Sequence, residues 1–180
     1  LKTYAVSVDM RLADSNTVRV ELTADGQSFV YEQYLGGKVI VNEVDDSVTT
    51  ADLAKTENGV DATFSKEGGM LKAVLPVPRN NRRQQAFTLT GTLLTGLGSD
   101  SASLSVLMQA TQGSTVSVYL AGSKGEVSLA NVTFGADAQT VSLSLSNVNW
   151  NKVGDVQCLR FVAVGSQTEV TVGIGRVLVY

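Results

Sequence analysis

The stretch VQCLRFVAVGSQTEVTVGIGRVLVY, residues 156–180, decides the fold class of this chain. Its first part, Val156–Val164, is dense in Val, Leu and Phe, and its last part, Glu169–Tyr180, is equally apolar. Gly165-Ser166-Gln167 between them has the composition of a turn, because glycine adopts unusual backbone dihedrals at no steric cost. A terminal segment this apolar has to be paired and packed. The stretch therefore predicts two strands and a turn, with the last strand held inside a sheet.

The composition of the whole chain favours the same all-β architecture. Seventeen glycines stand against two prolines, and Ser, Thr and Val are abundant, which is typical of strands and tight turns rather than helices. At 180 residues, 43% of them hydrophobic, the chain has the length and the apolar content of one domain with a sizeable core. We therefore expect a single antiparallel β-sandwich domain of jelly-roll type over residues 1–180.

Period-two alternation of apolar and polar residues supports this fold along most of the chain. Three expected strands lie at 3–12, 18–23 and 27–35, and Asp25-Gly26 between the last two is a strong hairpin signal. Residues 87–93 form another expected strand, in which Phe and Leu alternate with Thr. Roughly a dozen short strands separated by turns are expected in total, which is the pattern of a sandwich or a barrel.

Residues 43–69 are acidic and form the least regular part of the chain. Thr49–Ala54 has the composition of a helical turn, with Thr50 as its N-cap. An acidic loop can hold calcium, which takes several oxygen ligands, but the spacing here is not that of an EF-hand. Solvated loop charge is the favoured interpretation. We expect no cofactor, and a structural calcium ion stays the alternative.

Several function classes are excluded by composition. The chain contains no histidine, which removes Ser-His-Asp and Cys-His catalysis and nearly all zinc, copper and non-haem iron sites. The net charge of −3 argues against a broad nucleic-acid-binding surface. No run approaches the roughly eighteen apolar residues that would span a membrane. Cys158 has no second cysteine to pair with, and its apolar neighbours predict a buried thiol that acts as a small hydrophobe.

From Phe87 onward the order of the expected strands resembles that of jelly-roll carbohydrate-binding modules with galactose-binding-like architecture. The resemblance rests on the rhythm of FTLTGTL (87–93), SLSVLMQ (103–109), VSVYLAG (116–122), QTVSLSLSNV (139–148), LRFVAVG (159–165) and TVGIGRVLVY (171–180). It is a pattern of strand spacing, and it covers half of the chain. Gly175-Arg176 stands where such modules often carry an acidic or amide residue, so the resemblance leaves the family's structural calcium site open.

A module of this kind needs an aromatic face to cover the C–H face of a sugar ring, and polar groups to bond its hydroxyls. Trp150 lies in a polar loop between two asparagines, and Tyr119 lies on the wet face of its strand. A Trp150 side chain that folds back to seal the end of the sandwich is an equal alternative. Together with Tyr31, Gln109 and Arg160, these two aromatic residues are the candidate carbohydrate-binding residues, on a concave sheet surface.

The resemblance implies a non-catalytic module that binds a polysaccharide of the β-glucan, xylan or mannan type. It also implies secretion or attachment to a cell surface, and an appended glycoside hydrolase that the module targets. The alternative is a structural or adhesive β-sandwich module of a cell-surface or virion fibre protein. We expect no enzyme activity, because a sandwich hydrolase needs two carboxylates about 5–9 Å apart and no acidic pair shows the expected strand spacing.

The polar, basic loop Arg79–Gln85 is the last feature that bears on function. It could present guanidinium and amide groups to a sugar or a carboxylate. A plain solubilising connection is the favoured interpretation of this loop.

Overall fold

The computed structural model describes residues 17–24, 27–34, 39–80 and 82–180. The chain divides into two compact units, one of residues 1–39 with Tyr180 and one of residues 40–179. The expectation of a single domain over residues 1–180 stays a prediction.

The first unit contains an antiparallel hairpin. Strands β1 (Thr17–Ala24) and β2 (Gln27–Tyr34) pair in full register, with Ala24 opposite Gln27. This register leaves two residues for the connection, as the Asp-Gly signal predicts for a tight hairpin. The hairpin prediction is confirmed, whereas the strand expected at 3–12 lies outside the described residues.

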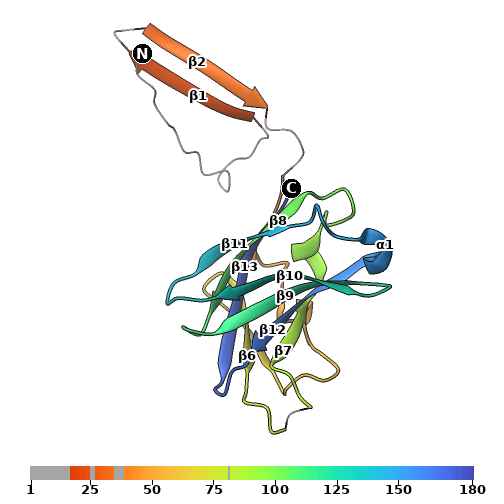
Figure 1. The fold of residues 1–180 in the computed structure, drawn as a ribbon. Helices are drawn as coiled ribbons and strands as arrows, with labels where there is room; N and C mark the ends of the chain where they lie inside the picture. The colour runs from red at the N-terminus through yellow and green to blue at the C-terminus, as the bar shows by residue number, and fades with distance from the viewer. Residues whose placement is uncertain (1–16, 25–26, 35–38, 81) are drawn as a thin grey trace. The chain divides into compact units, whose positions relative to one another are not determined.

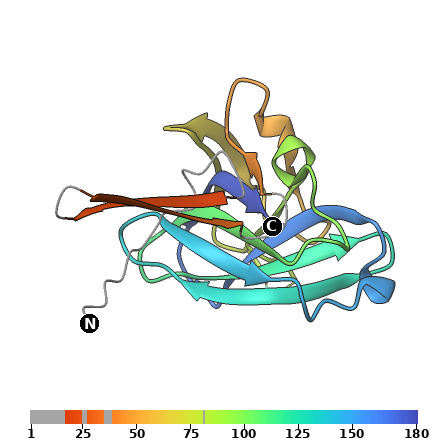
Figure 2. The ribbon, with the colours of Figure 1, turned by 90° about the horizontal axis from the view of Figure 1, so that it is seen from above.

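The second unit is an antiparallel β-sandwich, which confirms the predicted all-β, jelly-roll fold class. Its sheets form separate layers in both ribbon views (Figures 1 and 2). The five-stranded sheet has the order β10 (Glu126–Thr133), β9 (Thr115–Gly122), β12 (Val156–Val164), β7 (Ala86–Leu89), β4 (Leu53–Lys55). The six-stranded sheet has the order β11 (Gln139–Ser144), β8 (Ser103–Ala110), β13 (Val170–Val179), β6 (Met70–Leu75), β5 (Thr63–Glu67), and β3 (Ile40–Asn42) also pairs with β13.

The C-terminal strand β13 lies in the middle of its sheet, as the opening stretch predicts. One of its edges pairs with β8, and the other pairs with β6 along Val170–Ile174 and with β3 along Val177–Val179. Strand β12, however, belongs to the opposite sheet, so the turn after Val164 crosses between the two layers rather than closing a hairpin. The last two strands therefore connect the two sheets, with one strand in the interior of each.

The core lies between the two sheets, where the inward residues of each strand meet. Phe87 and Phe161 are fully buried, and their rings stack with centroids 5.0 Å apart and planes 15° apart. Leu104, Met108 and Ile174 are likewise fully buried in the facing sheet. Alternation of this kind places the other half of each strand on an outer face, which is where a ligand can reach it.

Two local expectations are wrong by a few residues. The strand expected at 87–93 ends at Leu89, and Gly91–Leu94 is instead a 3₁₀ helix. Gly91 has a φ of 80°, and a side chain there would collide with the Asp52 carboxylate, so the turn that ends the strand requires glycine at this position. The helical turn expected near residue 50 is present at Thr50–Asp52, but its N-cap is Thr49.

Carboxylates of the acidic stretch cap local turns. The Asp52 carboxylate accepts the Thr49 backbone N–H at 3.0 Å, while the Thr49 hydroxyl accepts the Ala51 N–H at 3.2 Å. Asp45 accepts the Ser47 hydroxyl at 2.6 Å and the Ser47 N–H at 2.9 Å. The pKa of Asp45 is lowered, chiefly by the hydrogen bond from the Ser47 hydroxyl.

Candidate functional site

The outer face of the five-stranded sheet carries two of the predicted site residues side by side. Tyr119 of β9 lies directly opposite Arg160 of β12. Their chain neighbours Val118, Leu120 and Phe161 are fully buried, so alternation turns Tyr119 and Arg160 away from the core. This is the orientation that the sequence pattern predicts for both.

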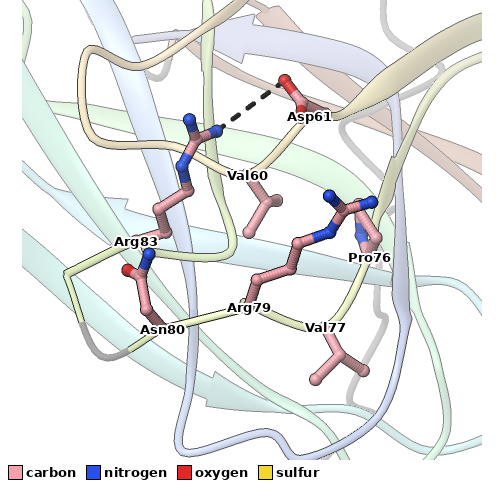
Figure 3. A pocket seen from close by; sticks show the side chains of 7 residues that line it. All are labelled: Val60, Asp61, Pro76, Val77, Arg79, Asn80 and Arg83. Carbon is pink, nitrogen blue, oxygen red and sulfur yellow. Dashed lines mark ion pairs between the residues drawn. The ribbon is translucent and has the colours of Figure 1, made fainter.

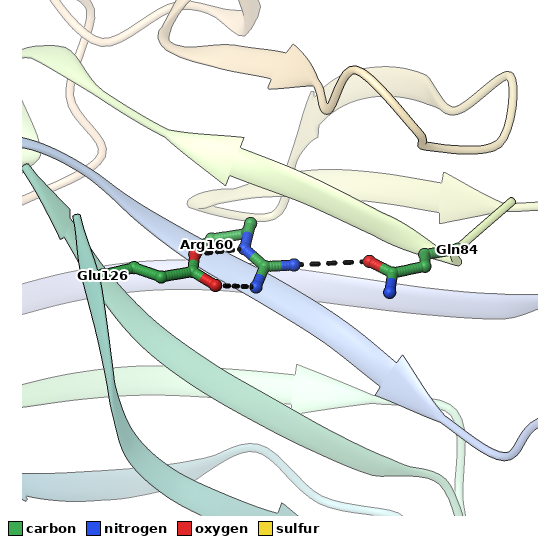
Figure 4. A network of polar contacts seen from close by, with 3 residues as sticks. All are labelled: Gln84, Glu126 and Arg160. Carbon is green, nitrogen blue, oxygen red and sulfur yellow. Dashed lines mark hydrogen bonds and ion pairs between the residues drawn. The ribbon is translucent and has the colours of Figure 1, made fainter. Parts of the chain in front are cut away.

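The Arg160 guanidinium is held by three neighbours. Nε and Nη2 donate to the two carboxylate oxygens of Glu126 at 2.9 and 2.6 Å, and Nη1 donates to Gln84 Oε1 at 3.4 Å (Figure 4). The guanidinium carbon also lies 4.5 Å from the centroid of the Tyr119 ring, a cation–π contact. With one hydrogen bond from each of its three nitrogens and its side chain only 19% exposed, Arg160 is placed to fix the Tyr119 ring.

An open depression of about 380 Å³ lies beside Tyr119 on the same face. Its apolar part comes from the end of β12, where Val164 is 51% exposed, and its polar part includes Arg83 and Gln84. The residues that line it are Pro78, Arg83, Gln84, Gln85, Tyr119, Val162, Ala163, Val164, Gly165 and Ser166. An aromatic ring, an exposed apolar strip and a polar rim therefore border one surface.

Gln85 anchors the loop that forms one wall of this depression. It is only 3% exposed, and its Nε2 donates to the carbonyls of Leu75 at 2.9 Å and Thr168 at 2.8 Å. The backbone carbonyl of Gln85 accepts the Ala163 N–H at 2.8 Å. This role of Gln85 leaves no signal in the sequence, because a glutamine at the end of a polar loop has the pattern of a solvated residue.

A second depression of about 260 Å³ is lined in part by the same loop (Figure 3). Arg83 borders both depressions. Its Nη1 donates to the Gly59 carbonyl at 3.2 Å and lies 3.7 Å from the Asp61 carboxylate. The residues that line this second depression are Val60, Asp61, Pro76, Val77, Arg79, Asn80 and Arg83. The basic loop is therefore part of a shaped surface.

Gln109 does not join this face, which corrects the expectation of one surface shared with Tyr119 and Arg160. It lies in β8 of the six-stranded sheet, opposite Gly173 of β13. There it lines a separate depression of about 230 Å³, and its Nε2 donates to the Ala136 carbonyl at 3.3 Å. Alternation predicts that Gln109 faces outward, but it does not reveal on which sheet.

Trp150 is the first residue of the single helical turn α1 (Trp150–Val153) rather than part of an irregular loop. Its side chain is half-buried and packs against the core. The turn is fixed to the adjoining sheet, since the Val153 carbonyl accepts the Lys124 N–H at 3.0 Å. This geometry favours the alternative in which Trp150 seals one end of the sandwich.

Tyr31 lies in β2 of the first unit, where it pairs with Val20. Its side chain falls outside the part of the chain that the structure describes. The assignment of Tyr31 to a binding surface therefore stays a prediction.

Cys158 is half-buried on the outer face of the five-stranded sheet, opposite Ala121, and not inside the core as expected. Side chains two residues apart in a strand point to the same face, so Cys158 lies on the same side of β12 as Arg160. Partial burial raises the pKa of the Cys158 thiol, against an opposing effect of Arg160 and with a smaller contribution from Glu126.

Within the described ranges, no three side chains of the types His, Cys, Asp and Glu gather as metal ligands would. None of the helices in that part of the chain has the length and apolar character needed to cross a membrane.

No protein-family model matches the sequence, and no curated protein matches it either. Solved carbohydrate-binding modules of family 29 match the structure. One is 13% identical with a TM-score of 0.54, over 79% of this chain and 89% of that chain. A variant complexed with cellulohexaose is 13% identical with a TM-score of 0.54, over 80% and 92%. A variant complexed with mannohexaose is 14% identical with a TM-score of 0.51, over 79% and 92%. The chain thus has the β-sandwich fold of these modules, which confirms the resemblance at the level of fold.

Proposed function

We propose that this chain is a non-catalytic module that binds polysaccharide on the outer face of its five-stranded sheet, with Tyr119 as the stacking platform. The observation that carries the proposal is the open depression that Tyr119 shares with an exposed apolar strip and a polar rim. Sugar rings present one apolar face and a rim of hydroxyls, so they need both kinds of surface at once.

The support that Arg160 gives to Tyr119 suits such a platform. A ring held by a guanidinium on one side loses less side-chain freedom when a ligand packs on the other, so binding costs less conformational entropy. In this proposal Arg160 is a positioning residue, and the contacts to hydroxyls come from the rim residues Arg83 and Gln84. The depression itself is lined by no Asp or Glu, whereas glycoside hydrolysis by the usual route needs two carboxylates.

The finer parts of the proposal concern the ligand and the cellular context. The solved family 29 variants with cellulohexaose and mannohexaose make β-glucan and mannan the first ligands to try, with xylan beside them. We further propose that the module is secreted or displayed at a cell surface and that it targets an appended glycoside hydrolase.

Gel retardation across plant and microbial polysaccharides tests the proposal, with the wild type beside Tyr119→Ala and Gln109→Ala. The two substitutions lie on opposite sheets, so each is the control for the other. We expect at least one polymer to retard the wild type and Gln109→Ala but not Tyr119→Ala. Urea unfolding of each variant checks that the fold is intact.

Loss of retardation in Gln109→Ala alone would move the site to the six-stranded sheet and overturn the proposed face. Trp150→Ala belongs to the same series, because loss of binding there with an intact fold would contradict its sealing role. No retardation by any polymer would overturn carbohydrate binding itself. The structural or adhesive alternative would then lead, and the mass of the protein in solution would be the next measurement.

A further inference from the structure

The loop between the two depressions is strongly basic in a protein whose net charge is −3. Arg79, Arg82 and Arg83 fall within five residues, and no Asp or Glu occurs anywhere between Glu67 and Asp100. The loop is also well anchored, because Gln84 exchanges backbone hydrogen bonds with the segment at residues 58–60. The C-terminal end of the loop, next to Arg83, is therefore held in place.

The charge of this loop is not balanced locally. Asp61 is the only carboxylate among the residues that line the two depressions, and it already has two cations near it, Lys55 at 3.5 Å and Arg83 at 3.7 Å. Arg79 and Arg82 have no ion-pair partner among the residues that the structure describes. Figure 3 shows the Arg83 side chain extending to Asp61, with which it forms an ion pair, and the Arg79 guanidinium ending beside Pro76 with no ion pair drawn.

We propose that this loop recognises an anionic substituent of the polysaccharide, a carboxylate or a sulfate ester, while a neighbouring sugar of the same chain packs against Tyr119. The inference rests on the proposed function and narrows its ligand class to acidic glycans. A guanidinium offers a planar fork of donors that matches a carboxylate or a sulfate oxygen pair, and Arg79 has such a fork free.

The sharing of Arg83 by the two depressions favours a glycan over another polyanion. Arg83 borders both, so a single extended ligand can meet Tyr119 in one and Arg79 in the other. The apolar residues Val60, Pro76 and Val77 line the second depression, and they suit the C–H faces of a further sugar ring. A flexible acidic peptide would use the cations but would have no need of the Tyr119 surface.

The experiment compares retention of the wild type, Arg79→Gln, Arg79→Lys and the control Lys152→Gln. The gels contain polygalacturonate, dextran sulfate, neutral glucomannan or polyglutamate. Arg79 is the better residue to change, since Arg83 also bonds the Gly59 carbonyl and its loss would disturb the loop. Lys152 is an equally exposed cation in α1, away from both sets of lining residues. Tyr119→Ala is included in every gel.

We expect at least one acidic glycan to bind more tightly than glucomannan, and this preference to fall as salt is raised. Arg79→Gln should weaken binding of that glycan about three- to fivefold, with Arg79→Lys in between and Lys152→Gln unchanged. Polygalacturonate and dextran sulfate distinguish a carboxylate from a sulfate ester. Tyr119→Ala should abolish retention of both acidic and neutral glycans.

Three results would overturn the inference. Equal retention by acidic and neutral glycans, unaffected by Arg79→Gln, would show that the loop does not recognise an anionic substituent, and would leave the proposed function standing. Retention by polyglutamate as strong as by the acidic glycans would show a nonspecific polyanion surface. No retention by any polymer would overturn the inference together with the proposed function.

Discussion

The contact between Arg160 and Glu126 leads to a prediction about how the Tyr119 platform is held. The changes are Arg160→Ala, Glu126→Ala and the two combined. The carboxylate accepts two hydrogen bonds at 2.9 and 2.6 Å, a geometry that is typical of the stronger arginine–carboxylate pairs. The two side chains are 19% and 43% exposed, so water still screens the pair.

The expected coupling follows from this exposure. Two unit charges about 4 Å apart attract by about 1 kcal/mol at the dielectric constant of water and by about 4 kcal/mol at an effective value of about 20. Exposed ion pairs measured by double-mutant cycles give about 0.2–1 kcal/mol. Because the pair is bidentate and Arg160 is largely shielded, we expect a coupling near the top of that range, about 1 kcal/mol, in the free energy of unfolding, and the exposure of Glu126 keeps it from exceeding the range. Arg160→Ala should cost about 0.5–1 kcal/mol more than Glu126→Ala, since it also removes the contact with Tyr119.

Urea unfolding of the four proteins measures the coupling, first at low salt and then near 1 M salt, where screening should reduce it. Glucomannan retention of Glu126→Ala provides a second readout, and it should fall modestly because the ring is held less firmly. A coupling below about 0.3 kcal/mol at low salt would contradict the reasoning, because the pair would then be no better than an ordinary surface contact.

Three further outcomes are expected. Phe161→Ala should lower the free energy of unfolding by about 3–5 kcal/mol in urea, because it removes a buried ring that stacks on Phe87. Gly122→Ala should lower the melting temperature, since its Cβ would lie 2.5 and 2.6 Å from two backbone oxygens, whereas Gly135→Ala meets nothing within 4 Å and should change little. Alkylation of Cys158 should reach half its maximal rate at a higher pH than a free thiol does, because the fold favours the protonated thiol and raises its pKa. For the same reason, the free energy of unfolding should fall as the pH rises through the raised pKa. An alkylation profile equal to that of a free thiol would contradict this prediction.

Alternation along single strands predicted which residues face outward, and it did so for a local reason. The side-chain direction in a strand depends only on the parity of its residues, so Tyr119 and Arg160 could be oriented from the sequence. The same rule oriented Gln109 correctly but could not assign it to a sheet. That assignment depends on pairing with β13, more than sixty residues further along the chain.

The parts that the sequence did not predict involve contacts between distant segments. Gln85 is a structural residue only because Leu75 and Thr168 bring carbonyls to its amide, and Thr168 is 83 residues away. Trp150 lies beside two asparagines, yet the short turn that contains it folds onto the core. In both cases a polar setting in the sequence becomes a packed setting in the structure, and local composition carries no signal of the change.

The central position of β13 has a consequence for how this protein is made. Its hydrogen bonds join strands that begin at Ile40, Met70 and Ser103. Until residues 170–179 arrive, the six-stranded sheet would therefore be two separate pairs, β8 with β11 and β5 with β6, and the unpaired strand β3. During synthesis the nascent chain would hold open strand edges and an unclosed core until β13 has left the ribosome, and pairing over such long sequence separations is slow. We expect the newly made protein to be most prone to aggregate in that interval, and a chain stopped before residue 170 to need chaperones to stay in solution.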